Sequence, residues 1–193
     1  MPPDNFEKKE VEAVAVARPS KEIILEEVFS WAKMIVITVL AAVLLNQFVI
    51  VNATIPTGSM EYTIMENDRV VAFRLSYLFN PPERFHIVIF RSPDNETRLY
   101  VKRIIGLPGE TVEIRGGRVF IDGAEEALRD DFVKGAIEGY HGPVTVPEDH
   151  YFVLGDYRSN SSDSRRWNNP FVRRDQILGR AVFKYFRGFA ILQ

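Results

Sequence analysis

The longest apolar run of the chain covers residues 34–51, which contain three polar side chains: Thr38, Asn46 and Gln47. As an α-helix, these roughly 18 residues would be about 27 Å long, close to the thickness of the hydrocarbon core of a bilayer. Ser20 is a suitable N-cap for a helix that continues into this run. The pattern therefore predicts one membrane-spanning helix over residues 20–51.

Two other interpretations of the run are open. A buried core helix is disfavoured, because such a helix seldom has an apolar surface all round. A cleaved secretory signal is the second, since Val51-Asn52-Ala53 has the form of a small-residue processing site. The segment before the run is long for such a signal, so we favour a retained anchor.

The distribution of basic residues predicts an orientation for this anchor. Arg18, Lys21 and Lys33 precede or enter the run, and no Lys or Arg follows it until Arg69. The positive-inside rule then places the N-terminus in the cytoplasm and the remainder outside the cell membrane. Residues 1–19 are rich in charge, alanine and valine, and we expect them to form a mobile cytoplasmic tail.

Beyond the run, short strand-like stretches alternate with Pro, Asn and Asp, and no amphipathic helix of useful length is found. The expected strands are Arg69–Phe73, His86–Phe90, Leu99–Ile105, Tyr151–Leu154 and Gly179–Phe186. Residues 155–170 form a very polar loop between the last two. The pattern predicts a mainly β fold, in which the apolar helix is followed by an antiparallel β-domain of about 140 residues over 52–193.

Residues 111–122 read as a hairpin around Gly116-Gly117. Its register would pair Ile114 with Val119 and Val112 with Ile121, which places four aliphatic side chains on one face.

Two apolar segments, residues 75–79 and 183–192, mix aromatic side chains with polar ones. Such segments suit contact with a membrane interface. They equally suit core strands and loop anchors, and both interpretations remain open.

Composition narrows the chemistry. The formal net charge is -2, so no strongly basic surface points to nucleic acid. The chain has no cysteine, which excludes a thiolate nucleophile or metal ligand. The histidines His86, His141 and His150 lack ligand spacing. We therefore expect no metal and no other cofactor.

Lys102 is an unusual residue for the strand that contains it. Side chains alternate along a strand, so Tyr100, Lys102 and Ile104 share one face. If that face is buried, desolvation lowers the pKa of the amine and makes it a candidate base. An ordinary lysine that reaches the rim of the sheet is the alternative.

Ser59 follows a turn favoured by Pro56 and Gly58, eight residues past the apolar run. Eight extended residues reach at most about 28 Å, which keeps Ser59 near the membrane surface. A nucleophilic serine needs a base. Lys102 on an apolar face is a better candidate than the histidines, which lie in an apolar strand or among turn residues.

Three motifs carry a resemblance to a known family. They are Ser59-Met60-Glu61-Tyr62-Thr63, the stretch from Lys102 to Glu110 and the stretch from Gly155 to Arg165. Their order and approximate spacing resemble those of bacterial type I signal peptidases of the single-span type.

The resemblance implies a serine endopeptidase with a role for each matching residue. Ser59 would be the nucleophile and Lys102 the general base, while Thr57 and the Ser59 N–H would hold the oxyanion. Ser161 would orient the lysine amine. Asp163 and Arg165 would support the site, in the same loop as Asp156 and Arg158.

The chain departs from the family pattern at two positions. Tyr62 stands where S-M-x-P-T has proline, and Tyr157 stands where G-D-N-R has asparagine. Both changes affect local loop geometry, and Tyr62 lies where it can alter the substrate groove.

The resemblance also implies the substrate, which is an exported preprotein with a signal peptide that ends in small residues, typically Ala-x-Ala. Narrow apolar subsites would exclude larger side chains. The candidate walls of these subsites are Ile55, Met60, Tyr100 and Val101, each of which is equally compatible with ordinary core packing. The partners expected are preproteins and the lipid bilayer.

Two other classes of protein would require sequence features that this chain lacks. A penicillin-binding acyltransferase needs lysine three residues after the serine, where this chain has Tyr62. A self-cleaving repressor should carry a DNA-binding helical module instead of an apolar span. The remaining alternative is an anchored β-domain that binds exported chains without cutting them.

Overall fold

The computed structural model describes residues 21–137, 139–186 and 188–192. The predicted tail at residues 1–19 lies outside them. The chain divides after Ala42 into a helical unit and a β unit that starts at Val43.

The first element is α1 (Lys21–Phe48), a 28-residue helix with no buried side chain. It is long and apolar enough to cross a membrane, and no other helix in the described part of the chain is. It ends before the predicted limit at residue 51. The reason is that Ile50 and Val51, which are β-branched, pair with Phe73 and Ala72 in a sheet.

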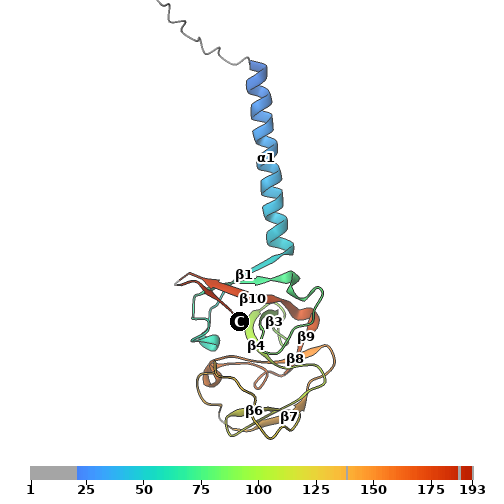
Figure 1. Ribbon diagram of the computed structural model, residues 1–193, viewed down its shortest axis with the longest axis vertical. Coiled ribbons are helices and arrows are strands. Elements are labelled where there is room, and N and C mark those ends of the chain that lie inside the picture. Colours follow the sequence, from blue (N-terminus) through green and yellow to red (C-terminus); the bar gives the residue numbers. More distant parts are fainter. Residues whose placement is uncertain (1–20, 138, 187, 193) are drawn as a thin grey trace, which may run out of the picture. The chain divides into compact units, whose positions relative to one another are not determined.

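The main sheet holds most of the strands and is antiparallel throughout (Figure 1). Its path runs β1-β2-β10-β3-β4-β8-β9, with β11 paired to β10. The strands are β1 (Ile50–Thr54), β2 (Arg69–Phe73), β3 (Ile87–Arg91), β4 (Leu99–Gly106), β8 (His150–Leu154), β9 (Val172–Arg173), β10 (Ile177–Tyr185) and β11 (Ala190–Ile191). The predicted fold class, mainly antiparallel β with one N-terminal apolar helix, is confirmed.

A second sheet has three strands in the order β6-β5-β7. They are β5 (Thr111–Arg115), β6 (Arg118–Ile121) and β7 (His141–Thr145). The predicted hairpin register is confirmed, since Val112 pairs with Ile121 and Ile114 with Val119. Both turn glycines have positive φ, 55° at Gly116 and 78° at Gly117, as a tight hairpin turn requires.

Short 3-10 turns replace helices in the described part of the β unit: η1 (Gly58–Met60), η2 (Arg74–Tyr77), η3 (Arg158–Asn160) and η4 (Arg174–Gln176). Three apolar clusters form the core. One of them joins the two sheets, because Ile105 of β4 and Phe152 of β8 pack with Val112 of β5.

The two apolar segments are divided between core and surface. Tyr77 and Leu192 are buried, whereas Phe79 is 89% exposed, Phe189 71% and Ile191 72%. Neither interpretation therefore describes a whole segment.

Candidate active site

Ser59 is positioned by the hairpin that β1 and β2 form. Hydrogen bonds from Ile55 N to Asp68 O (3.0 Å) and from Asn67 N to Ile55 O (2.7 Å) extend this hairpin past the end of β1. The chain then turns through η1, where Ser59 is only 6% exposed.

Lys102 meets Ser59 from the middle of β4. It pairs with Val88 of β3, and its side chain is 3% exposed. Its Nζ lies 2.5 Å from Ser59 Oγ and 5.8 Å from the centre of the Tyr100 ring. The structure thus brings the two residues together across 43 positions of sequence.

The environment favours the neutral form of this amine. Burial lowers the pKa of Lys102 from 10.5 to about 8, against the opposing charges of Asp163 and Asp156. With a pKa near 8, roughly a tenth of the amine is neutral at pH 7 and half at pH 8. The amine is therefore able to accept a proton close to neutral pH.

Thr57 lies on the open side of the pair. Its Oγ1 is 3.4 Å from Ser59 Oγ, and the side chain is exposed. The hydroxyl is therefore close to where an oxyanion would form during attack by Ser59.

The loop after β8 carries the remaining predicted residues. Asp163 is fully buried and forms a two-point ion pair with Arg165, from Nε to Oδ1 and from Nη2 to Oδ2, both 2.8 Å. Burial opposes ionisation of Asp163, but Arg165, the Ser161 hydroxyl and the Gly155 N–H hold its pKa below the ordinary value. Ser161 is fully buried and makes no hydrogen bond to Lys102 within the described residues.

Gly155 and Tyr157 connect this loop to Ser59. Tyr157 N donates to Ser59 O at 3.1 Å. A Cβ on Gly155 would lie 2.4 Å from Ser59 O and 2.3 Å from Ser161 Oγ. Position 155 therefore admits only glycine if this loop is to stay against η1.

A buried ion pair behind the site was not predicted. Arg103 donates to both carboxylate oxygens of Asp156, at 2.9 and 2.7 Å, and Thr63 Oγ1 donates to the same carboxylate at 2.7 Å. Arg103 is 3% exposed and Asp156 is fully buried. Strand alternation places Arg103 on the opposite face from Lys102, but the sequence gives no local signal for its burial or for its partner.

A cavity of about 50 Å³ lies beside Ser59 and Lys102. Ile55, Tyr100 and Val101 line it, as expected of subsite walls. Met60 does not, because it is fully buried in the core, where its Sδ contacts Asp156 N at 3.4 Å. The expectation for Met60 is corrected on this ground.

The histidines lie away from the pair. His86 Nδ1 forms a hydrogen bond with Tyr77 Oη (3.1 Å). His141 and His150 are the first residues of β7 and β8. Within the described ranges, no group of three or more His, Asp or Glu side chains is arranged to hold a metal ion.

The chain is similar to known proteins over most of its length. The model of the family "Signal peptidase, peptidase S26" matches residues 28–186. Signal peptidase I of Leptolyngbya laminosa is 38% identical, over 80% of this chain and 77% of that protein. Signal peptidase I of Bacillus amyloliquefaciens is 37% identical, over 82% of this chain and 88% of that protein.

A solved structure is also similar. The crystal structure of a signal peptidase I from Enterococcus faecalis has 37% sequence identity and a TM-score of 0.42, covering 52% of this chain and 97% of that one.

The family-model match and the two relatives in Leptolyngbya laminosa and Bacillus amyloliquefaciens confirm the family resemblance and the prediction of an enzyme, and they remove the non-cutting binding domain as an alternative. The chain therefore belongs to the peptidase S26 family of signal peptidases and is a serine endopeptidase that removes signal peptides.

Proposed function

We propose that this protein is a membrane-anchored signal peptidase that cuts exported preproteins after small-x-small sites, typically Ala-x-Ala, with Ser59 as nucleophile and Lys102 as general base. The observation that carries the proposal is the 2.5 Å approach of Lys102 Nζ to Ser59 Oγ in a buried site. A nucleophile and its base need this hydrogen-bond distance.

The chemistry follows from the neutral amine. Lys102 accepts the proton of the Ser59 hydroxyl while Oγ attacks the scissile carbonyl carbon, which gives a tetrahedral intermediate. The ammonium of Lys102 then gives its proton to the leaving amine, and an acyl-enzyme ester on Ser59 remains. Water deprotonated by Lys102 hydrolyses this ester and restores Ser59.

Oxyanion stabilisation is assigned to the Ser59 N–H and the Thr57 hydroxyl. Thr57 Oγ1 lies 3.4 Å from Ser59 Oγ, on the exposed side of the nucleophile. A single oxyanion donor lowers the activation barrier by about 3 kcal/mol. Asp163 and Arg165 would keep the loop that carries Ser161 in place beside the dyad.

The preference for small residues has a physical basis in the cavity next to Ser59. This cavity is small, about 50 Å³ against about 290 Å³ for the cavity beside the loop after β8, which supports a preference for small side chains. β8 pairs with β4 from Arg103 onward, so residues 99–102 have β3 as a partner on one edge and no paired strand of the described chain on the other. An extended substrate can add along this edge.

The anchor completes the proposal. α1 contains an apolar stretch long enough to cross a membrane, and basic residues precede this stretch. We therefore place residues 1–19 in the cytoplasm, residues 20–51 as the anchoring region and the catalytic domain, 52–193, outside the cell membrane. The lipid bilayer and exported preproteins are its partners.

Cleavage of a preprotein by the purified protein in detergent tests the proposal. Ser59→Ala is expected to abolish cleavage, and Ser162→Ala, an exposed serine of the loop after β8, is expected to leave it unchanged. Mass spectrometry of the product should show a cut after an Ala-x-Ala sequence. Full activity of the Ser59 variant, or a cut after a large side chain, would contradict the proposal.

A further inference from the structure

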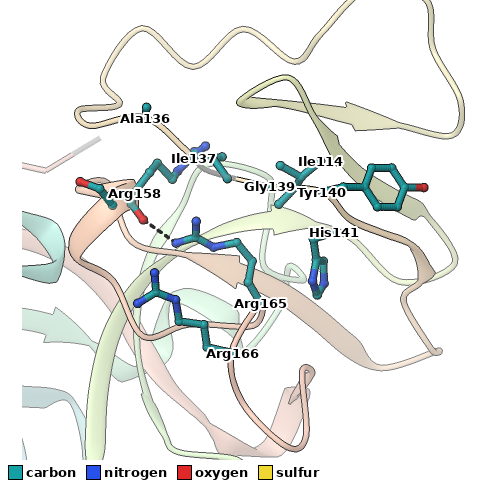
Figure 2. Close-up of a pocket in the computed structure, with 10 residues that line it drawn as sticks. Ile114, Ala136, Ile137, Gly139, Tyr140, His141, Arg158, Arg165 and Arg166 are labelled. Atoms are coloured by element: carbon teal, nitrogen blue, oxygen red, sulfur yellow. Dashed lines mark hydrogen bonds between the residues drawn. The ribbon is translucent and has the colours of Figure 1, made fainter.

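A second cavity, of about 290 Å³, opens beside the loop that follows β8 (Figure 2). It shares no lining residue with the cavity at Ser59. One side is built from η3 and the loop residues after it. The other is built from Ile114 of β5 and from the residues Ala136, Ile137, Gly139, Tyr140 and His141. The reaction proposed above makes no use of this space.

Three arginines line the cavity: Arg158, Arg165 and Arg166. Figure 2 shows their side chains on the same side of it, with Arg165 hydrogen-bonded to the Arg158 carbonyl (2.7 Å). Arg158 is paired with Asp130 at 2.9 Å and Arg165 with Asp163.

Arg166 has a different environment from the other two. Its guanidinium forms no ion pair within the described residues, and none of the described lining residues is acidic. The ion pairs of Arg158 and Arg165 involve one carboxylate each. Arg166 is left as a guanidinium without a carboxylate partner in the part of the chain that the structure describes.

His141 adds a nitrogen atom to the lining that the rest of the described protein does not use. Its Nε2 is buried and has no hydrogen-bond partner within the described residues. In the tautomer that carries a proton on Nε2, this atom is a donor to a bound anion.

We propose that this cavity binds the phosphate group of a phosphomonoester. A planar carboxylate is satisfied by one guanidinium, as Asp163 is by Arg165. Three arginines, together with His141 and Ser159 in the same lining, offer more donors than one carboxylate needs and suit a group with more acceptor oxygens. The apolar side chains of Ile114 and Ile137 leave room for an organic part.

Isothermal titration calorimetry of the full chain in detergent, in a phosphate-free buffer of low ionic strength, tests the proposal. The probes are inorganic phosphate, glycerol 3-phosphate and acetate. Both phosphates are expected to bind, with acetate at least tenfold weaker. Absence of phosphate binding, or acetate binding of equal strength, would overturn the proposal.

Variants locate the site. Arg166→Gln is expected to weaken phosphate binding at least tenfold without changing the melting temperature, because the side chain is exposed and makes no ion pair. Arg91→Gln removes the same charge from an exposed position at the end of β3 and should bind as the unchanged protein does. Equal weakening in both variants would indicate a general charge effect and overturn the assignment.

A phosphomonoester can come from a lipid headgroup or from solution, and nanodiscs distinguish the two. If phosphatidic acid fills the site, discs that contain it should weaken titration with glycerol 3-phosphate relative to phosphatidylcholine discs. If the ligand is soluble, both discs should give the same affinity. No cleavage is measured in any of these titrations, so their outcome is independent of the proposed peptidase mechanism.

Discussion

The rings of Tyr62 and Tyr157 contact each other edge to face, with 5.8 Å between their centres and an angle of 83°. These are the two positions at which the chain departs from the sequence pattern of its family. Tyr62 follows Ser59 by three residues, and Tyr157 N is bonded to Ser59 O. The two departures therefore form one contact beside the nucleophile.

The backbone of Tyr62 predicts that proline, the residue of the family pattern, destabilises the protein at position 62. Tyr62 has φ 74°, whereas proline holds φ near about −65°. Tyr62→Pro should therefore lower the free energy of unfolding by more than about 1 kcal/mol and reduce cleavage. Tyr62→Gly, which fits the backbone, should lose only the ring contact, worth about 0.5–1.5 kcal/mol. Chemical denaturation measures both, and a proline variant as stable as the unchanged protein would contradict the account.

Gly155 gives a prediction about the geometry of the site. A methyl group there would meet Ser59 O and Ser161 Oγ at less than 2.5 Å, so the loop has to move away from η1. Gly155→Ala should lower kcat/KM at least about 100-fold, since a displacement of about 1 Å has an effect of this size. Cleavage kinetics check it beside a circular dichroism spectrum, and unchanged kinetics would show that the loop does not position the dyad.

The Arg103–Asp156 pair gives a prediction about stability. Arg103→Met leaves a buried carboxylate without its counterion and should cost about 3–5 kcal/mol. Arg173→Met breaks pairs with Glu96 and Asp175 in which the arginine side chain is 47% exposed, and it should destabilise the protein far less, because water screens these pairs. Urea denaturation compares the two, and equal costs would show that burial does not determine the effect.

Lys102 itself should reduce stability at neutral pH. Its pKa in the folded chain, about 8, is below the ordinary 10.5, so the unfolded chain binds more protons between these values and stability rises with pH there. Lys102→Met should therefore be more stable at pH 7, by up to about 3 kcal/mol, and inactive. The difference should shrink as the pH rises from about 8 to 10.5. A variant less stable at pH 7 would contradict the burial of a partly charged amine.

The sequence predicted the elements with strong periodicity and missed those defined by distant partners. The β5–β6 hairpin was predicted in register because its alternation and turn glycines are local signals. β1 could not be predicted from the apolar run, because Ile50 and Val51 fit a membrane helix as well as a strand. Only their pairing with β2 makes them a strand. The two-residue strands β9 and β11 are too short to have a pattern.

The residues of the active site also fall into those with a local sequence signal and those defined by a distant partner. Alternation along β4 made Lys102 a candidate for a buried amine and left an ordinary rim lysine as the alternative. Only the family resemblance connected it with Ser59, 43 residues earlier. Arg103 was overlooked because its partner, Asp156, is 53 residues away. Met60 was assigned to a wall because it is next to Ser59, whereas the turn of η1 directs it into the core.

The pH dependence of kcat/KM for preprotein cleavage tests the central claim most directly, with folding monitored by circular dichroism at each pH. If neutral Lys102 is the base, activity should fall about tenfold per pH unit below an apparent pKa near 8. A profile that stays flat down to about pH 5, or one that falls only below about pH 6.5 as a histidine base would give, would contradict the Ser59–Lys102 mechanism.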